Sequence, residues 1–153
     1  MTAGARELAA AIRRGQRSPV EVVDEQIALI ERHDPQLNAV IVHRFEEARE
    51  EARAAERALA GGVEVGSLHG VPVTVKEALE LEGLPFTNGS LLEADRIGTR
   101  DAAAVRALRG AGAIVIGTTN LSEFCCFYDS DNRVYGRTRN PHDPERTPGG
   151  RRG

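Results

Sequence analysis

The fold class is clearest in DAAAVRALRGAGAIVIGTTN, residues 101–120. Its first half predicts a helix that Asp101 opens as an N-cap, that turns Val105 inward and that Gly110 ends. Its second half contains AIVIG at 113–117, an apolar run without alternation, which is typical of a strand covered on both faces. A helix followed by such a strand favours an α/β fold.

A second strand is expected upstream, in HGVPVTVKEALE at residues 69–80. Val71, Val73 and Val75 alternate with other residues, so one face of this strand is apolar. Lys76 ends the run. On the pattern alone it is an exposed lysine at a strand end. If Lys76 is buried instead, its amine favours the neutral form, because burial removes the hydration of the charged form. A neutral amine is a capable general base.

Helices are expected before these strands. The first covers residues 5–16, and a second follows the capping box formed by Ser18 and Glu21. We expect this second helix to end before Pro35, because the residue that precedes a proline avoids helical angles.

A short strand at 37–42 and a charged helix at 44–60 come next. The helix has a narrow alanine seam on its inner face and ends at two glycines, Gly61 and Gly62. Residues 81–97 lose all periodicity and predict a long loop, and the chain becomes polar after Asn120.

Composition excludes several classes of protein. The net charge is −3, which argues against a general nucleic-acid binder, and no apolar run is long enough to cross a bilayer. The N-terminus mixes arginine with glutamate and lacks the apolar centre of a signal peptide, so the cytoplasm is the expected compartment. The four histidines are scattered without metal-ligand spacing. Two adjacent cysteines, Cys125 and Cys126, predict reduced thiols, at least one of them buried.

Two glycine-rich stretches have different explanations. GAGAIVIG at 110–117 fails as a dinucleotide loop, because its glycines precede the strand and Val115 stands at the third glycine position. The tail after residue 136 carries five arginines, but Asp143 and Glu145 interrupt the charge and stacking aromatics are missing. RNA binding is therefore not expected.

Several ordered segments together resemble the amidase signature family of amide hydrolases. The resemblance implies the N-terminal part of the amidase signature fold, an incomplete α/β structure with a mixed β-sheet flanked by helices. Residues 1–153 would be a partial domain, with a helical region at 1–62 and the start of the α/β core at 63–153. The matching segments are LHGVPVTVKEA, NGS, DAAAVRALRGAGAIVIGTTNLSEF, NRVYGRTRNP and DPERTPGG.

The family uses a Ser–Ser–Lys triad without metal or organic cofactor, and its lysine matches Lys76. Glu77 replaces the usual aspartate after that lysine. The family's glycine- and serine-rich stretch matches PGGRRG here, so Gly149 and Gly150 are expected to line the site. Arg151 stands at the bridging-serine position and Arg152 beside it. The nucleophilic serine of the family lies further along than residue 153.

An arginine stays charged and cannot relay a proton, so we expect this chain alone to be an inactive part of a small-molecule amidase. Two alternatives stay open: a non-catalytic remnant or interaction module, and a fragment of a tRNA-dependent amidotransferase A-type subunit. We hypothesise that a one-base deletion turned Gly-Gly-Ser-Ser-Gly into Gly-Gly-Arg-Arg-Gly. An incomplete sheet leaves its edges uncovered, which predicts self-association.

Overall fold

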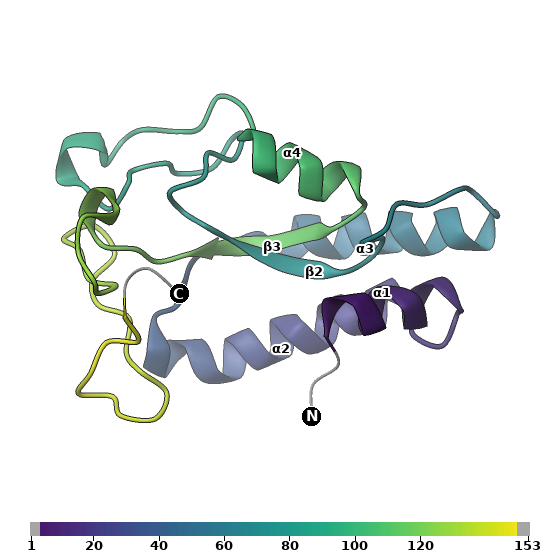
Figure 1. Ribbon diagram of the computed structural model, residues 1–153, viewed down its shortest axis with the longest axis horizontal. Coiled ribbons are helices and arrows are strands. Elements are labelled where there is room, and N and C mark those ends of the chain that lie inside the picture. The colour runs from purple at the N-terminus through teal and green to yellow at the C-terminus, as the bar shows by residue number, and fades with distance from the viewer. Residues whose placement is uncertain (1–3, 150–153) are drawn as a thin grey trace.

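A computed structural model describes residues 4–149 of the chain. The α-helices and strands follow one another in the order that the sequence pattern predicts, and a long irregular segment follows the last strand (Figure 1). The elements are α1 (Ala5–Arg13), α2 (Pro19–Leu37), β1 (Val40–His43), α3 (Phe45–Ala60), β2 (Pro72–Lys76), η1 (Leu91–Glu93), α4 (Ala103–Gly110), β3 (Ile114–Thr119) and η2 (Glu123–Cys125).

The three strands form one mixed sheet in the order β1-β3-β2. The central strand, β3, runs antiparallel to β1 and parallel to β2. Its first five residues are all buried, which confirms that both faces of this strand are covered. The α/β fold class is therefore as predicted, and the loops that follow β2 and β3 emerge at the same end of the sheet (Figure 1).

Two helical layers cover the two faces of β3. Ile114 and Ile116 pack with residues of α2 and α3, among them the fully buried Ile27. Val115, which points to the opposite face, packs with Val105 of α4. This alternation follows from the pleat of a strand, which sends successive side chains to opposite faces.

Helix α3 contacts the core through its alanines, as the sequence predicts. Ala48 and Ala52 are both completely buried, whereas Glu46 and Glu47 in the first turn are exposed. Because alanine side chains are small, the helix packs close to its neighbours, but each alanine buries little apolar area. On the outer face, Glu46 forms an ion pair with Arg49, one turn further along, at 2.5 Å.

The ends of α2 confirm one prediction and correct another. Ser18 accepts hydrogen bonds from the backbone of the first turn, and Glu21 completes the capping box. The helix does not end before Pro35 but continues to Leu37. Pro35 lacks an N–H, which costs the last turn a single backbone hydrogen bond. Asn38 ends the helix in left-handed backbone, and the Asp34 side chain accepts hydrogen bonds from the Ala39 and Val40 N–H groups beyond it.

Asp101 is not the N-cap of α4, which begins after Ala102 without a side-chain cap. Its carboxylate instead accepts hydrogen bonds from the Glu82 N–H and from Arg109 in the last turn of the helix. It thus joins the start of the 81–97 loop region to α4. Local sequence could not reveal this, because the partner N–H lies 19 residues away.

The prediction of a buried cysteine is also wrong: Cys125 is half-buried and Cys126 is exposed, and both thiols are free.

Within residues 4–149, no helix is long and apolar enough to cross a membrane. The outer strands β1 and β2 border the sheet, and Leu92, Phe127 and Tyr128 are largely exposed. Self-association and the division of the chain at residue 62 stay predictions.

Candidate active site

Lys76 is the last residue of β2 and the only lysine in the chain. It pairs in register with Thr119, the last residue of the parallel strand β3. The backbone N–H of Glu77 then donates to the Thr119 carbonyl at 3.0 Å, and the chain turns away from the sheet. The half-buried lysine therefore lies at the carboxyl end of two parallel strands, where open α/β sheets bind their ligands.

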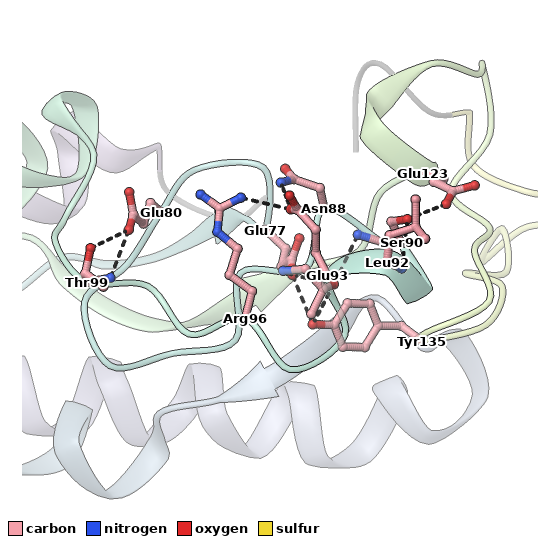
Figure 2. A network of polar contacts seen from close by, with 12 residues as sticks. Glu77, Glu80, Asn88, Ser90, Leu92, Glu93, Arg96, Thr99, Glu123 and Tyr135 are labelled. Carbon is pink, nitrogen blue, oxygen red and sulfur yellow. Dashed lines mark hydrogen bonds and ion pairs between the residues drawn. The ribbon is translucent and has the colours of Figure 1, made fainter.

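Glu77, directly after the lysine, is almost completely buried, with 1% of its surface exposed. Its Oε1 atom accepts three hydrogen bonds: from the Thr87 N–H at 2.5 Å, from the Thr87 hydroxyl at 2.9 Å and from the Tyr135 hydroxyl at 3.0 Å. Figure 2 shows the carboxylate and the tyrosine hydroxyl facing each other. Three segments distant in sequence thus meet at one oxygen atom.

Burial acts on the pKa of both acidic groups in this cluster. Burial raises the pKa of Glu77 above its usual range, and the hydrogen bonds from Thr87 and Tyr135 offset part of this effect. Burial, followed by the charge of Glu77, raises the pKa of Tyr135 to about 12, although a hydrogen bond with Thr87 lowers it. The tyrosine hydroxyl therefore keeps its proton and acts as a donor at neutral pH.

The turn at 87–90 is built around the same threonine. The Thr87 hydroxyl also accepts from the Gly89 N–H at 3.1 Å, while Asn88 adopts a left-handed backbone with φ of 51°. The Asn88 side chain donates to Glu93 at 2.8 Å, and Ser90 donates to Glu123 at 2.6 Å (Figure 2). The NGS segment is thereby fixed to the loop that follows β3.

A network of amides orders the polar segment after β3. Asn120 is 3% exposed and donates to the Gly136 carbonyl at 2.9 Å and to the Thr138 hydroxyl at 3.0 Å. Its Oδ1 accepts from the Asn132 amide at 2.8 Å, and Asn132 in turn accepts from the Tyr135 N–H at 2.8 Å. This network positions Tyr135 for its contact with Glu77.

The other residues expected in the site lie further along the chain. Gly149 is half-buried with φ of 92°, a left-handed conformation that favours glycine. Gly150, Arg151 and Arg152 lie outside the described residues. The role of Lys76 as a general base, and of the glycines as lining residues, stays a prediction.

Sequence reasoning did not identify Thr87, Asn120, Asn132 or Tyr135 as parts of this region. The signals present were the segments NGS and NRVYGRTRNP, which are family motifs but do not by themselves give each side chain a role. Glu77 stood out only as a substitution for aspartate. Among residues 4–149, no group of three histidine, cysteine or acidic side chains is arranged to hold a metal ion.

Comparisons with known proteins agree with this architecture. The family model Amidase matches residues 21–151. The chain is 46% identical over 147 residues to an indoleacetamide hydrolase of Bradyrhizobium diazoefficiens. It is 44% identical over 141 residues to the A-type subunit of a glutamyl-tRNA(Gln) amidotransferase of Nitratidesulfovibrio vulgaris. These matches cover 96% and 92% of this chain.

A solved structure of a bacterial aryl acylamidase of the amidase signature family superimposes with a TM-score of 0.86 at 35% identity, over 97% of this chain. The chain therefore belongs to the amidase family. It spans 28% of the length of each of the two curated relatives and 31% of the aryl acylamidase.

Proposed function

We propose that this chain is the lysine-bearing part of an enzyme that hydrolyses carboxamide C–N bonds through a Ser–Ser–Lys triad. The observation that carries the proposal is the place of Lys76, half-buried at the carboxyl end of β2 beside the central parallel strand. Glu77 and the loops it joins surround this strand end. Membership of the amidase family supports the same reaction class.

In the proposed reaction, the amine of Lys76 accepts a proton from the bridging serine, which takes one from the nucleophilic serine. The nucleophile's oxygen attacks the amide carbonyl carbon, and backbone N–H groups stabilise the oxyanion that forms. The C–N bond breaks as the leaving nitrogen receives the proton. Water then adds to the acyl-enzyme, releases the carboxylic acid and restores the serine.

The 153-residue chain by itself is proposed to lack this activity. Its residues 148–153 read PGGRRG, so Arg151 occupies the bridging position. A guanidinium that stays protonated at any usable pH can neither accept nor pass on the proton. The family pattern therefore supplies no serine hydroxyl for Lys76 to activate within these 153 residues. A cytoplasmic location and a small-molecule amide substrate complete the proposal.

A chimera tests the proposal. Residues 1–150 are joined to the part of the Bradyrhizobium indoleacetamide hydrolase that follows its matching segment, and ammonia release from indoleacetamide is measured. We expect the chimera to hydrolyse the amide and Lys76→Ala to reduce kcat by about a hundredfold or more. The matched control is Arg100→Ala, whose side chain is 81% exposed and which should leave kcat unchanged.

Three outcomes would contradict the proposal. Hydrolysis by the chimera that persists in the Lys76→Ala variant would remove the lysine from the mechanism. Ammonia release by the 153-residue chain itself, abolished by Lys76→Ala, would show that the chain needs no further serine. A folded chimera that is inactive on every amide tested would favour a non-catalytic interaction module.

A tRNA-dependent amidotransferase A-type subunit is the second candidate, because one such subunit is 44% identical to this chain. The parallel chimera carries the remainder of the Nitratidesulfovibrio protein and is assayed for glutamine hydrolysis with the other components of that enzyme. Activity of this chimera alone would favour the amidotransferase. Activity of the indoleacetamide chimera alone favours a free amidase.

A further inference from the structure

The side chain of Glu77, the residue after Lys76, places a carboxyl group inside the protein. It is 1% exposed, and a buried carboxyl group is costly unless donors compensate for its lost hydration. All three described donors converge on Oε1. Oε2 is buried and has no partner of hydrogen-bond geometry among residues 4–149.

The donors come from two separate loops. Thr87 begins the turn that contains NGS, ten residues after the carboxylate. Tyr135 comes from the loop after β3 and lies 58 residues further along the chain. The glutamate therefore joins both loops to the end of the strand that carries the lysine.

Each loop is also held from its other side. Ser90 donates to Glu123, and Asn120 binds the backbone of the 132–138 loop at Gly136. Beside those contacts, Glu77 binds both loops directly at the end of β2. A glycine at position 89 fits this close approach, since a Cβ there would lie 3.1 Å from the Asn132 side chain.

We propose that Glu77 is a positioning residue of the amidase site, which clamps the 87–90 turn and the 132–138 loop to the end of β2 and so sets the surroundings of Lys76. The inference rests on the proposed function only in naming the site that the clamp organises. The clamp itself is a set of contacts within this chain. It is therefore tested without measuring hydrolysis.

The groups that face the carboxyl group simplify the experiment. Thr87 and Tyr135 supply the hydrogen bonds that lower its pKa, and neither is charged at neutral pH. The chain has two tyrosines and no tryptophan, so Tyr128→Phe leaves Tyr135 as the sole fluorescent tyrosine. A carboxyl acceptor quenches the emission of a phenol, which makes this residue a reporter of the clamp.

The single lysine supplies a second reporter. Reductive methylation with isotope-labelled formaldehyde places a methyl signal on Lys76, which Lys76→Arg assigns against the N-terminal amine. Two Glu77 variants are compared in the Tyr128→Phe background. Glu77→Ala removes the acceptor, whereas Glu77→Gln keeps an oxygen that can accept from the same donors. Glu64→Ala, which changes an exposed glutamate, is the matched control.

We expect Glu77→Ala to increase Tyr135 emission, to displace the Lys76 methyl signal and to speed amide hydrogen exchange about tenfold in both loops, with α3 unchanged. Glu77→Gln should keep the parent methyl signal and exchange rates, as should Glu64→Ala. An unchanged Lys76 signal and unchanged loop exchange in folded Glu77→Ala would overturn the proposal. Equal effects of the alanine and glutamine variants would also overturn it.

Tyr135→Phe keeps the inference testable if Glu77→Ala fails to fold. This variant removes one hydroxyl, so exchange should increase in the 132–138 loop and stay slow at 87–90, where both Thr87 bonds persist. Exchange that increases equally in both loops, or in neither, would refute the clamp. A confirmed clamp in a chain whose indoleacetamide chimera is inactive would leave the inference standing and reject the proposed function.

Discussion

Replacing Asn120 by alanine tests how the irregular segment after β3 is held. Asn120 is 3% exposed, and its amide makes four hydrogen bonds of ordinary length. The Nδ2 atom donates to Gly136 and Thr138, and the Oδ1 atom accepts from the Leu121 N–H at 2.9 Å and from Asn132 at 2.8 Å. Alanine removes all four.

The magnitude follows from what each partner keeps. The Asn132 amide still donates to the Leu121 carbonyl at 2.9 Å, and the Thr138 hydroxyl still donates to Asn38 at 2.6 Å. The Leu121 N–H loses the partner described for it, and the Gly136 carbonyl keeps only a longer 3.4 Å contact. The buried Leu121 N–H is left unsatisfied, whereas the exposed Gly136 can bind water, so we predict a loss of about 1–3 kcal/mol in the free energy of unfolding.

The assay is urea unfolding followed by far-ultraviolet circular dichroism, with amide hydrogen exchange to locate the change. Asn140→Ala is the control, since Asn140 makes an exposed 2.9 Å bond to the His142 N–H and should cost less than about 1 kcal/mol. Exchange should increase first within residues 121–138. A loss for Asn120→Ala no larger than that of the control, or a loss spread evenly over α3 and β3, would refute the reasoning.

Three further predictions concern pH, core packing and association. Because burial raises the pKa of Glu77, the folded chain holds that proton more tightly than the unfolded chain; this contribution is complete at acid pH and is lost as pH rises through the folded pKa. Glu77→Gln should abolish this dependence. In urea titrations, the free energy of unfolding of the variant should therefore increase relative to that of the parent by at most about 1.4 kcal/mol per pH unit as the pH rises. Free energies that change in parallel with pH would contradict this prediction. Ile27→Ala, at a fully buried position, should lower the free energy of unfolding in urea by about 2–5 kcal/mol. The control Leu29→Ala, at an exposed position, should lower it by less than about 1 kcal/mol. Equal losses would argue against the packing of α2 on the sheet. Self-association predicts a sedimentation coefficient that rises with protein concentration, and a monomer with a concentration-independent melt would disprove it.

Much of the fold could be predicted because its signals are local. The alanine seam of α3, the capping box of α2 and the unbroken apolar run of β3 each depend on residues within a few turns of one another. The two errors at helix ends have different causes. Asp101 binds Glu82 and Arg109 instead of capping α4, so a distant partner changed a local preference. At Pro35 the helix loses only one backbone bond and ends three residues later at Asn38, in left-handed backbone.

In the candidate site, too, the sequence reveals some features and only the fold reveals others. Lys76 stands out from sequence because it ends an alternating valine strand inside a recognisable motif, and NGS and NRVYGRTRNP are motifs of the same family. The spacing of these motifs could not predict that both of their loops contact Glu77. A hydrogen bond between residues 58 apart depends on the whole path of the chain between them, and no local periodicity encodes that path.

Local signals predicted the family, the order of helices and strands and the lysine that ends β2, because side-chain periodicity and turn chemistry act over short distances. Tertiary structure alone decided that Glu77 is buried and that Thr87 and Tyr135 share its oxygen. Burial and the resulting rise in the pKa of Glu77 are properties of the packed surroundings. They exist only once the loops after β2 and β3 have come together at one end of the sheet.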